Sequence, residues 1–163
     1  MVSELQRTDG ARAPEFCTQL GFAYRFDWGM EGVQALAPGA VVVVVDVLRF
    51  TTAVCCALES GVEVLPYRWR DDTAAGFAAD HGAVLAGRRE HGELSLSPTD
   101  LLRARAGTRL VLPSPNGSTL AFAAGKLGAV HVLAGCLRNA AATARAARRL
   151  AGDGPIAVIA AGE

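Results

Sequence analysis

The sequence predicts an α/β protein with a mostly parallel sheet and helices on both faces, an α/β/α sandwich. The unbroken valine run Val41–Val45 suits a strand that is covered on both faces, as strands in a parallel sheet are. Strand-like and helix-like segments alternate along the chain, which is the pattern of such sheets. The 163 residues, 51% of them hydrophobic, are enough for one domain with its own core.

Seven segments predict strands, because each is a short apolar run bounded by turn-forming residues. In chain order they are Phe22–Trp28, Ala40–Asp46, Val62–Tyr67, Ala83–Ala86, Arg109–Leu112, Ala129–Leu133 and Ile156–Ala160. The second and third, with the helix predicted between them, form one strand–helix–strand unit.

Four segments predict helices. The first ends at a Ser-Gly pair, and the second is rich in alanine and opens with acidic residues. In chain order they are Phe50–Leu58, Asp71–Asp80, Ser118–Ala124 and Asn139–Ala151. Gly87–Asp100 has no periodicity and predicts a long loop over the sheet edge. Residues 1–15 are polar and predict a flexible tail, which leaves residues 16–163 as a single α/β domain.

Composition narrows the classes of partner. Lys plus Arg is 16 and Asp plus Glu is 16, so no net field draws the chain to nucleic acid or to a membrane surface, and an anion site has to be local. The four cysteines lack metal-ligand spacing and predict buried, reduced thiols, which favour a cytoplasmic location. No segment approaches the about 18 consecutive apolar residues of a membrane span, and a secretory signal is not evident.

The end of the valine strand combines charged and hydroxyl residues at a helix start. Asp46 and Arg49 stand at the carboxyl end of a strand, where open α/β sheets bind ligands. Asp46 is well placed to hold Mg²⁺ through oxygen, and the hydroxyls of Thr51 and Thr52 can donate to a phosphate. The alternative is structural: Arg49 pairs with Asp46, and the threonines cap the helix. We favour the functional interpretation.

The segment Pro113–Thr119 joins a strand to a helix and combines turn formers with hydroxyl residues. Asn116 and Gly117 can adopt left-handed conformations that direct successive N–H groups to one point, and the helix start adds partial positive charge. The segment therefore resembles a phosphate cradle. An equally weighted alternative is an ordinary turn in which Ser118 or Thr119 caps the helix.

The same layout recurs at Ala134–Asn139, before an alanine-rich helix. Arg138 offers a planar fork to phosphate or carboxylate oxygens, and Asn139 can hold a substrate hydroxyl. Taken alone, the segment favours the alternative in which Asn139 caps the helix and Arg138 is a solvated charge. Because the layout occurs at three strand ends, we favour a shared binding site.

The sequence lacks the signatures of several known phosphatase classes. No cysteine is followed by five residues and an arginine, so a cysteinyl-phosphate loop is unsupported. Asp46 has no second aspartate two residues later, as dehalogenase-like phosphatases do. His81, His91 and His131 are scattered without ligand or nucleophile spacing.

Four ordered segments resemble the 2-phosphosulfolactate phosphatase family: VVDVLRFTTAV (44–54), PSPNGSTL (113–120), AGCLRNA (134–140) and VIAAGE (158–163). Residues 27–32 and 94–98 also resemble segments of its members, so the likeness covers residues 26–163. The resemblance implies an α/β fold and a Mg²⁺-dependent phosphatase that hydrolyses 2-phosphosulfolactate to sulfolactate and phosphate, a step in coenzyme M synthesis.

Our hypothesis assigns each junction a part in phosphoryl transfer, which depends mostly on positioning and electrostatics. The nucleophile is a metal-bound water or Asp46 itself, which would form an aspartyl-phosphate. Asp46 and Glu163 bind the metal, Asn116–Thr119 with Thr51 and Thr52 bind phosphoryl oxygens, Arg49 and Arg138 neutralise substrate charge, and Asn139 orients the substrate.

The chain departs from the family pattern in ways that affect the substrate. Gly87–Glu90 stands where members have Gly-Glu-Arg, and Ser95–Pro98 where they have Gly-Asn-Ser-Pro. Members continue beyond the position of Glu163, so we expect that a C-terminal part is absent, and apolar surface exposed in this way would favour a homo-oligomer. Two rivals remain: an inactive homologue that binds a phospho-ligand, and a nucleotide-binding α/β domain, although the first strand lacks a glycine-rich turn.

Overall fold

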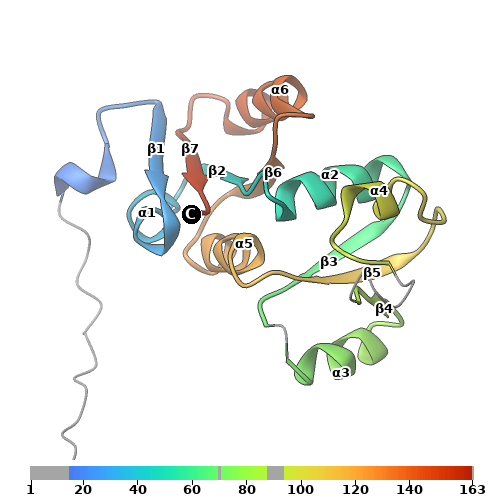
Figure 1. Cartoon of the computed structure of the whole chain (residues 1–163). Coiled ribbons are helices and arrows are strands. Elements are labelled where there is room, and N and C mark those ends of the chain that lie inside the picture. The colour runs from blue at the N-terminus through green and yellow to red at the C-terminus, as the bar shows by residue number, and fades with distance from the viewer. Residues whose placement is uncertain (1–14, 70, 88–93, 163) are drawn as a thin grey trace, which may run out of the picture.

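The computed structural model describes residues 15–69, 71–87 and 94–162, and it shows two parallel sheets with helices packed around them (Figure 1). The α/β fold class predicted from the sequence is confirmed. A short 3-10 helix, Glu15–Thr18, precedes the first strand. The predicted tail lies outside the described residues except for its last residue, Glu15.

The first sheet has four strands, all parallel, in the order β1-β7-β2-β6. They are β1 (Tyr24–Trp28), β7 (Ile156–Ala160), β2 (Val41–Val45) and β6 (His131–Gly135). The last residue of β2, Val45, is level with Ala160 of β7 and Gly135 of β6. The carboxyl ends of all four strands therefore meet at one edge of this sheet.

Helices cover both faces of the four-stranded sheet, which explains why β2 is valine throughout. On one face, Val42 and Val44 pack against α1 (Gly29–Leu36) and α5 (Gly117–Lys126). On the other face, Val41 and Val43 pack against α6 (Ala140–Ala151). Because side chains alternate along a strand, only a strand apolar at every position suits two covered faces, and each fully buried valine contributes roughly 1.5–3 kcal/mol.

The second sheet has three parallel strands in the order β3-β5-β4, namely β3 (Glu63–Tyr67), β5 (Arg109–Pro113) and β4 (Val84–Leu85). One face carries the helices α2 (Phe50–Glu59) and α4 (Pro98–Leu101), whose side chains form a core with Leu110 and Leu112 of β5. The helix α3 (Thr73–Asp80) packs against β4 and β5 and buries Ala74 and Ala78.

The expectation of one continuous sheet is wrong, and β2, α2 and β3 do not form a strand–helix–strand unit within one sheet. The partner of β2 is β6, whereas β3 pairs with β5. Both α2 and α5 contact β6 of the first sheet and β3 of the second, and Val54 and Phe122 line a cavity that these strands also border. These helices therefore link the two sheets and keep their strands from pairing.

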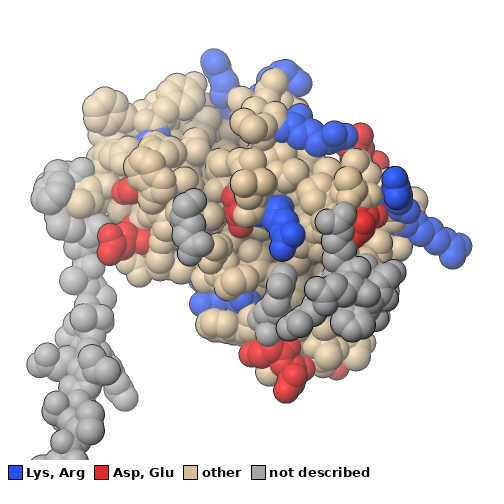
Figure 2. All heavy atoms as spheres, viewed as in Figure 1, with Lys and Arg blue, Asp and Glu red and all other residues tan. Residues whose placement is uncertain are grey.

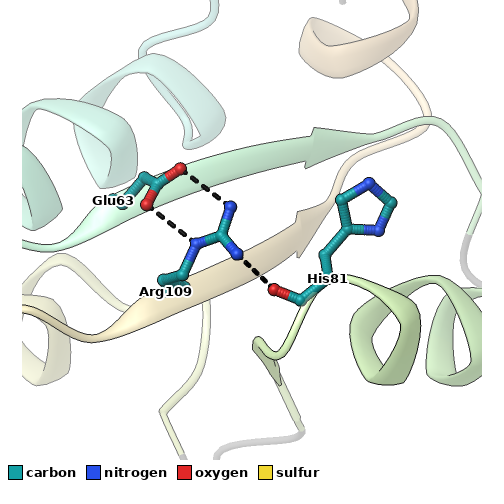
Figure 3. Close-up of polar contacts among 3 residues, drawn as sticks. All are labelled: Glu63, His81 and Arg109. Atoms are coloured by element: carbon teal, nitrogen blue, oxygen red, sulfur yellow. Dashed lines mark hydrogen bonds and ion pairs between the residues drawn. The ribbon is translucent and has the colours of Figure 1, made fainter.

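The amino ends of the second sheet are tied together by Arg109 (Figure 3). Its Nε donates to Glu63 Oε2 over 2.8 Å and its Nη2 donates to Glu63 Oε1 over 3.1 Å, which joins β5 to β3. Its Nη1 also donates to the carbonyl of His81, the residue after α3. One guanidinium thus connects two strands and the end of a helix, and its hydrogen bonds lower the pKa of Glu63.

Several elements differ from the sequence-based predictions, most of them by one or two residues at an end. The helix α1 was not predicted, because its eight residues include Gly29 and Gly32 and lack a side-chain cap; the burial of Val33 and Leu36 stabilises it instead. The predicted loop Gly87–Asp100 contains the start of α4 at Pro98, where a proline suits a first helical turn. The strand predicted at Ala129–Leu133 lies two residues later, as β6.

The surface of the visible face carries charges of both signs without a large field of either sign (Figure 2). The edge strand β1 exposes Tyr24, Phe26 and Trp28. The side-chain amide of Gln19 binds both the N–H and the carbonyl of Phe26, which occupies backbone groups that a further strand would need. Among the described helices, none combines the length and the apolar character that crossing a membrane requires.

Candidate functional site

A small pocket of about 190 Å³ lies where the carboxyl end of β2 approaches the carboxyl end of β5. These strands belong to different sheets, so the pocket lies between the sheets and not at one sheet edge as the sequence suggested. Two of the three predicted junctions meet here. The lining residues are Asp46, Leu48, Arg49, Phe50, Leu96 and Pro113–Asn116.

Asp46 is the residue that joins the two junctions. It follows β2 directly and is half-buried. Its Oδ2 accepts a hydrogen bond from the backbone N–H of Gly117, over 3.2 Å, in the first turn of α5. The carboxylate therefore stands at the partly positive end of a helix, as an anion is expected to do. The phosphate cradle predicted at this helix start is in contact with the predicted metal ligand.

Gly117 is required by this close approach. A Cβ at position 117 would lie 2.3 Å from Phe50 Cδ1 and 2.7 Å from Asp46 Oδ2, both shorter than real contacts. The glycine is therefore explained by the packing of three elements. The left-handed conformations expected at Asn116 and Gly117 are wrong: Asn116 has a φ of -94°, and Gly117 is the first residue of α5 and has no positive φ.

Thr51 and Thr52 hold the backbone around Asp46. Thr51 is fully buried; its hydroxyl accepts from the Asp46 N–H over 3.0 Å and donates to the Asp46 carbonyl over 2.8 Å. The Thr52 hydroxyl donates to the Val47 carbonyl over 2.7 Å. Neither residue caps α2, because Arg49 is the N-cap. A contact with substrate would require these bonds to be exchanged, so their binding role stays a prediction.

In the second junction, Pro113–Thr119, some polar side chains are exposed and others are buried or hydrogen-bonded within the protein. Asn116 is exposed, lines the pocket and is the N-cap of α5, so the alternative with Ser118 or Thr119 as the cap is wrong. The buried Ser118 hydroxyl donates to the Leu112 carbonyl over 3.2 Å. Thr119 is half-buried one position further along the helix.

Arg49 is the cationic side chain among the lining residues, and it is exposed. The alternative of a structural ion pair with Asp46 is not found: the ion pairs among the described residues join Glu63 to Arg109 and Glu59 to Arg138. The guanidinium of Arg49 is therefore available to an anion in the pocket.

The third junction lies at the same sheet edge as Asp46, but its polar side chains have other partners. Arg138 forms an ion pair with Glu59 at the end of α2, and the hydrogen bonds to Glu59 raise its pKa. Asn139 accepts from the Cys136 N–H over 2.8 Å and donates to the Ala134 carbonyl over 3.0 Å, which stabilises its own turn. Neither side chain lines the pocket of Asp46.

The four cysteines are free thiols, as predicted, but the expectation that they are buried is wrong for two of them. Cys56 and Cys136 are buried, whereas Cys17 and Cys55 are half-buried. Burial, and then the neighbouring Cys136, raises the pKa of Cys55, so its neutral thiol is favoured. Burial also raises the pKa of Cys56, so neither of these two thiols is an activated nucleophile.

The predicted metal ligand Glu163 lies outside the described residues. The chain leading to it runs beside Asp46, because the Ala161 N–H donates to the Val45 carbonyl over 2.8 Å. Among residues 15–69, 71–87 and 94–162, no group of three or more His, Cys, Asp or Glu side chains is arranged to hold a metal. Asp46 alone still fits Mg²⁺, which typically takes one or two carboxylates and completes its shell with water and phosphate oxygens.

Sequence reasoning did not name six of the lining residues as site residues: Leu48, Phe50, Leu96, Pro113, Ser114 and Pro115. Phe50 and Leu96 are buried and form apolar walls, and Ser114 is buried beside them. The Ser114 N–H donates to the Tyr67 carbonyl over 3.0 Å, so it also ties the loop to the end of β3. The signals that could have found them were their positions inside the segments 44–54, 94–98 and 113–120.

The fold and the pocket define an α/β protein with a small pocket at strand ends, lined by the Asp46 carboxylate and the Arg49 guanidinium beside the amino terminus of α5. The family model of 2-phosphosulpholactate phosphatase matches residues 30–163. The chain belongs to this family.

A curated relative from Thermus thermophilus, described as "Probable 2-phosphosulfolactate phosphatase", is 38% identical over 133 residues. The aligned region covers 78% of this chain and 55% of that relative. The chain thus spans little more than half the length of the relative.

Proposed function

We propose that this chain binds the phosphoryl group in a Mg²⁺-dependent phosphatase that hydrolyses a small anionic 2-phospho acid, 2-phosphosulfolactate, to sulfolactate and phosphate. Family membership supports the substrate class. The single observation that supports the site is the contact of Asp46 Oδ2 with the Gly117 N–H, which brings two strand ends into one pocket. Arg138 and Asn139, in the junction Ala134–Asn139, contribute to the site only if substrate binding breaks their present hydrogen bonds.

Each lining group has a role that its chemistry allows. The guanidinium of Arg49 neutralises phosphoryl charge, and the exposed amide of Asn116 donates to an oxygen of the substrate. Backbone N–H groups at the start of α5, with the partial positive charge of the helix, stabilise the same anion. Hydrolysis adds water across the P–O bond: phosphorus gains the oxygen of water, and the alcohol leaves with the ester oxygen and a proton.

A Mg²⁺ ion, when bound, would supply positive charge for the oxygens around phosphorus. Asp46 would hold it through Oδ1, because Oδ2 already accepts the Gly117 N–H. Glu163 is the second proposed ligand. The role of Thr51 is structural, since its hydroxyl bonds both the N–H and the carbonyl of Asp46 and so fixes the backbone of that residue.

Leu96 is proposed to select the substituent of the substrate. It is 7% exposed and lines the pocket, and its loop is held by Ser95, which accepts from the Ser97 N–H and donates to Asp100. The wall that it forms cannot pair with a polar substituent. A phospho acid with a less polar body than sulfolactate is therefore the substrate to test beside 2-phosphosulfolactate.

The cellular location, the metabolic pathway and the partners of the enzyme stay predictions. Free thiols predict a reducing, cytoplasmic location, and the family name suggests a place in coenzyme M synthesis. The partner is proposed to be a small phosphorylated anion, with a possible homo-oligomer and with no nucleic acid or membrane.

The experiment measures inorganic phosphate released from 2-phosphosulfolactate, 2-phospholactate and 2-phosphoglycolate by the chain, with Mg²⁺ and with EDTA. We expect release that needs Mg²⁺ and depends on the substituent. Arg49→Gln and Asn116→Ala should each lower kcat/KM by about tenfold or more, because each removes a hydrogen bond to a charged group. Binding of these compounds without any phosphate release would favour the inactive phospho-ligand-binding homologue and contradict the proposal.

A further inference from the structure

A second and larger cavity lies between the two sheets, beside the pocket of Asp46. It measures about 660 Å³, within the range of small-molecule sites. Its walls come from β2, β3, β6, α2 and α5 and are almost entirely apolar, with Val44, Val54, Val64, Phe122 and Leu133 among them. Phe50 is the one residue that lines both the cavity and the pocket of Asp46 in the described part of the chain.

Two cations stand at one side of this cavity. Lys126 lines it, and its Nζ lies 4.7 Å from the centre of the Phe122 ring. The Cζ of Arg68 lies 5.4 Å from the centre of the same ring and 5.0 Å from that of Trp69. Arg68 also continues the row of Val64 and Pro66, which line the cavity from β3. Both positive charges are thus held at the cavity by a shared aromatic ring.

These cations lack anionic partners in the described residues. The ion pairs there join Glu63 to Arg109 and Glu59 to Arg138, and neither pair includes Arg68 or Lys126. The Nε of Arg68 is buried without a hydrogen-bond partner. A buried donor without a partner is unfavourable, and an anion beside Arg68 would relieve it.

We propose that this cavity binds a small amphipathic anion, with its apolar body between α2, α5 and β3 and its carboxylate or phosphate group at Arg68 and Lys126. The apolar walls exclude a fully polar ligand, and the two cations select a charged head group. This site is distinct from the pocket of Asp46, so it does not depend on the proposed phosphatase activity.

The test is isothermal titration of the 163-residue chain with octanoate, octanol and acetate. Octanoate has the body and the charge, octanol only the body, and acetate only the charge. We expect saturable binding of octanoate, affinity at least about tenfold lower for octanol, and no measurable binding of acetate. Equal binding of octanol and octanoate would overturn the proposal.

Two glycine variants locate the binding. Gly125 lies in α5 and lines the cavity, and a Cβ there would meet nothing within 4 Å. Gly125→Leu should therefore fill the cavity and abolish octanoate binding without lowering thermal stability, because leucine favours a helix. Gly76 in α3 has equally open surroundings and does not line the cavity, so Gly76→Leu is the matched control and should bind normally.

The variant Arg68→Gln tests the contribution of the charged head group to binding separately from that of the apolar body. It should weaken octanoate binding at least about tenfold and leave octanol binding unchanged. Octanoate binding that survives in both Gly125→Leu and Arg68→Gln would show that the anion binds elsewhere and would overturn the proposal. Because the readout is binding, a failed phosphatase assay has no influence on this result.

Discussion

Asp46 and Gly117 determine how closely the two polar junctions approach each other. The Thr51 hydroxyl holds the backbone of Asp46, and the Gly117 N–H binds its carboxylate. Phe50 fills the space on the other side of Gly117. A side chain at position 117 would therefore separate β2 from α5, and with them the two halves of the pocket.

Gly117→Ala should lower the free energy of unfolding by about 1–3 kcal/mol, because the new methyl group overlaps Phe50 and Asp46. Urea denaturation measures this change. Gly125→Ala in the same helix is the control: its methyl group meets nothing within 4 Å, so stability should be equal or slightly higher. Equal losses in both variants would show that the close approach at position 117 is not the cause.

Arg138 forms an ion pair with Glu59, so it can bind the substrate only if the substrate anion displaces the Glu59 carboxylate. If substrate recruits Arg138, then Glu59 competes with substrate for it. We therefore expect Glu59→Gln to lower KM for the phosphoester and Arg138→Ala to raise KM by about tenfold. Steady-state kinetics on both variants measures this, and unchanged KM in both would remove Arg138 from the site.

Among the strands, β3 and β5 depend on the Glu63–Arg109 pair at their amino ends (Figure 3). The hydrogen bonds from Arg109 lower the pKa of Glu63 below its ordinary value of 4.5. A depressed carboxyl pKa contributes stability above the ordinary value, and this contribution is lost as the pH falls through the lowered pKa.

Glu63→Gln should therefore lower the melting temperature at pH 7 by a few degrees at most, since the pair is exposed. The difference from the wild-type chain should shrink as the pH falls below 4.5 and disappear under more acidic conditions. Thermal unfolding as a function of pH measures both effects. A difference that persists unchanged in acid would contradict the assignment to the ionised carboxyl group.

The helices show where local patterns are sufficient and where they are not. The start of α5 was predicted within one residue, at Ser118, although the left-handed turn expected at Asn116 and Gly117 does not form. The helix α1 was not predicted, because two glycines weaken its pattern and the burial of Val33 and Leu36 compensates only after folding. The ion-pair partner of Arg138 could not be predicted either, because Glu59 lies at the end of α2, 79 residues away along the chain.

For the molecule as a whole, the sequence was sufficient for the fold class and for the strand ends that bear polar residues. It was not sufficient for the division into two sheets, which depends on how α2 and α5 each pack against both β6 and β3. The pocket of Asp46 nevertheless forms, because the carboxyl ends of β2 and β5 face the same space from different sheets. Leu96 reaches it from a loop whose pattern has no periodicity.

The most direct measurement is the rate of Mg²⁺-dependent phosphate release by Asp46→Asn compared with the wild-type chain, with far-ultraviolet circular dichroism as the folding control. Asparagine keeps an oxygen that can accept the Gly117 N–H and removes only the charge, so the fold should be retained. The account predicts a fall in kcat of at least about 10²-fold. Equal rates in the two proteins would contradict the central role of the Asp46 carboxylate.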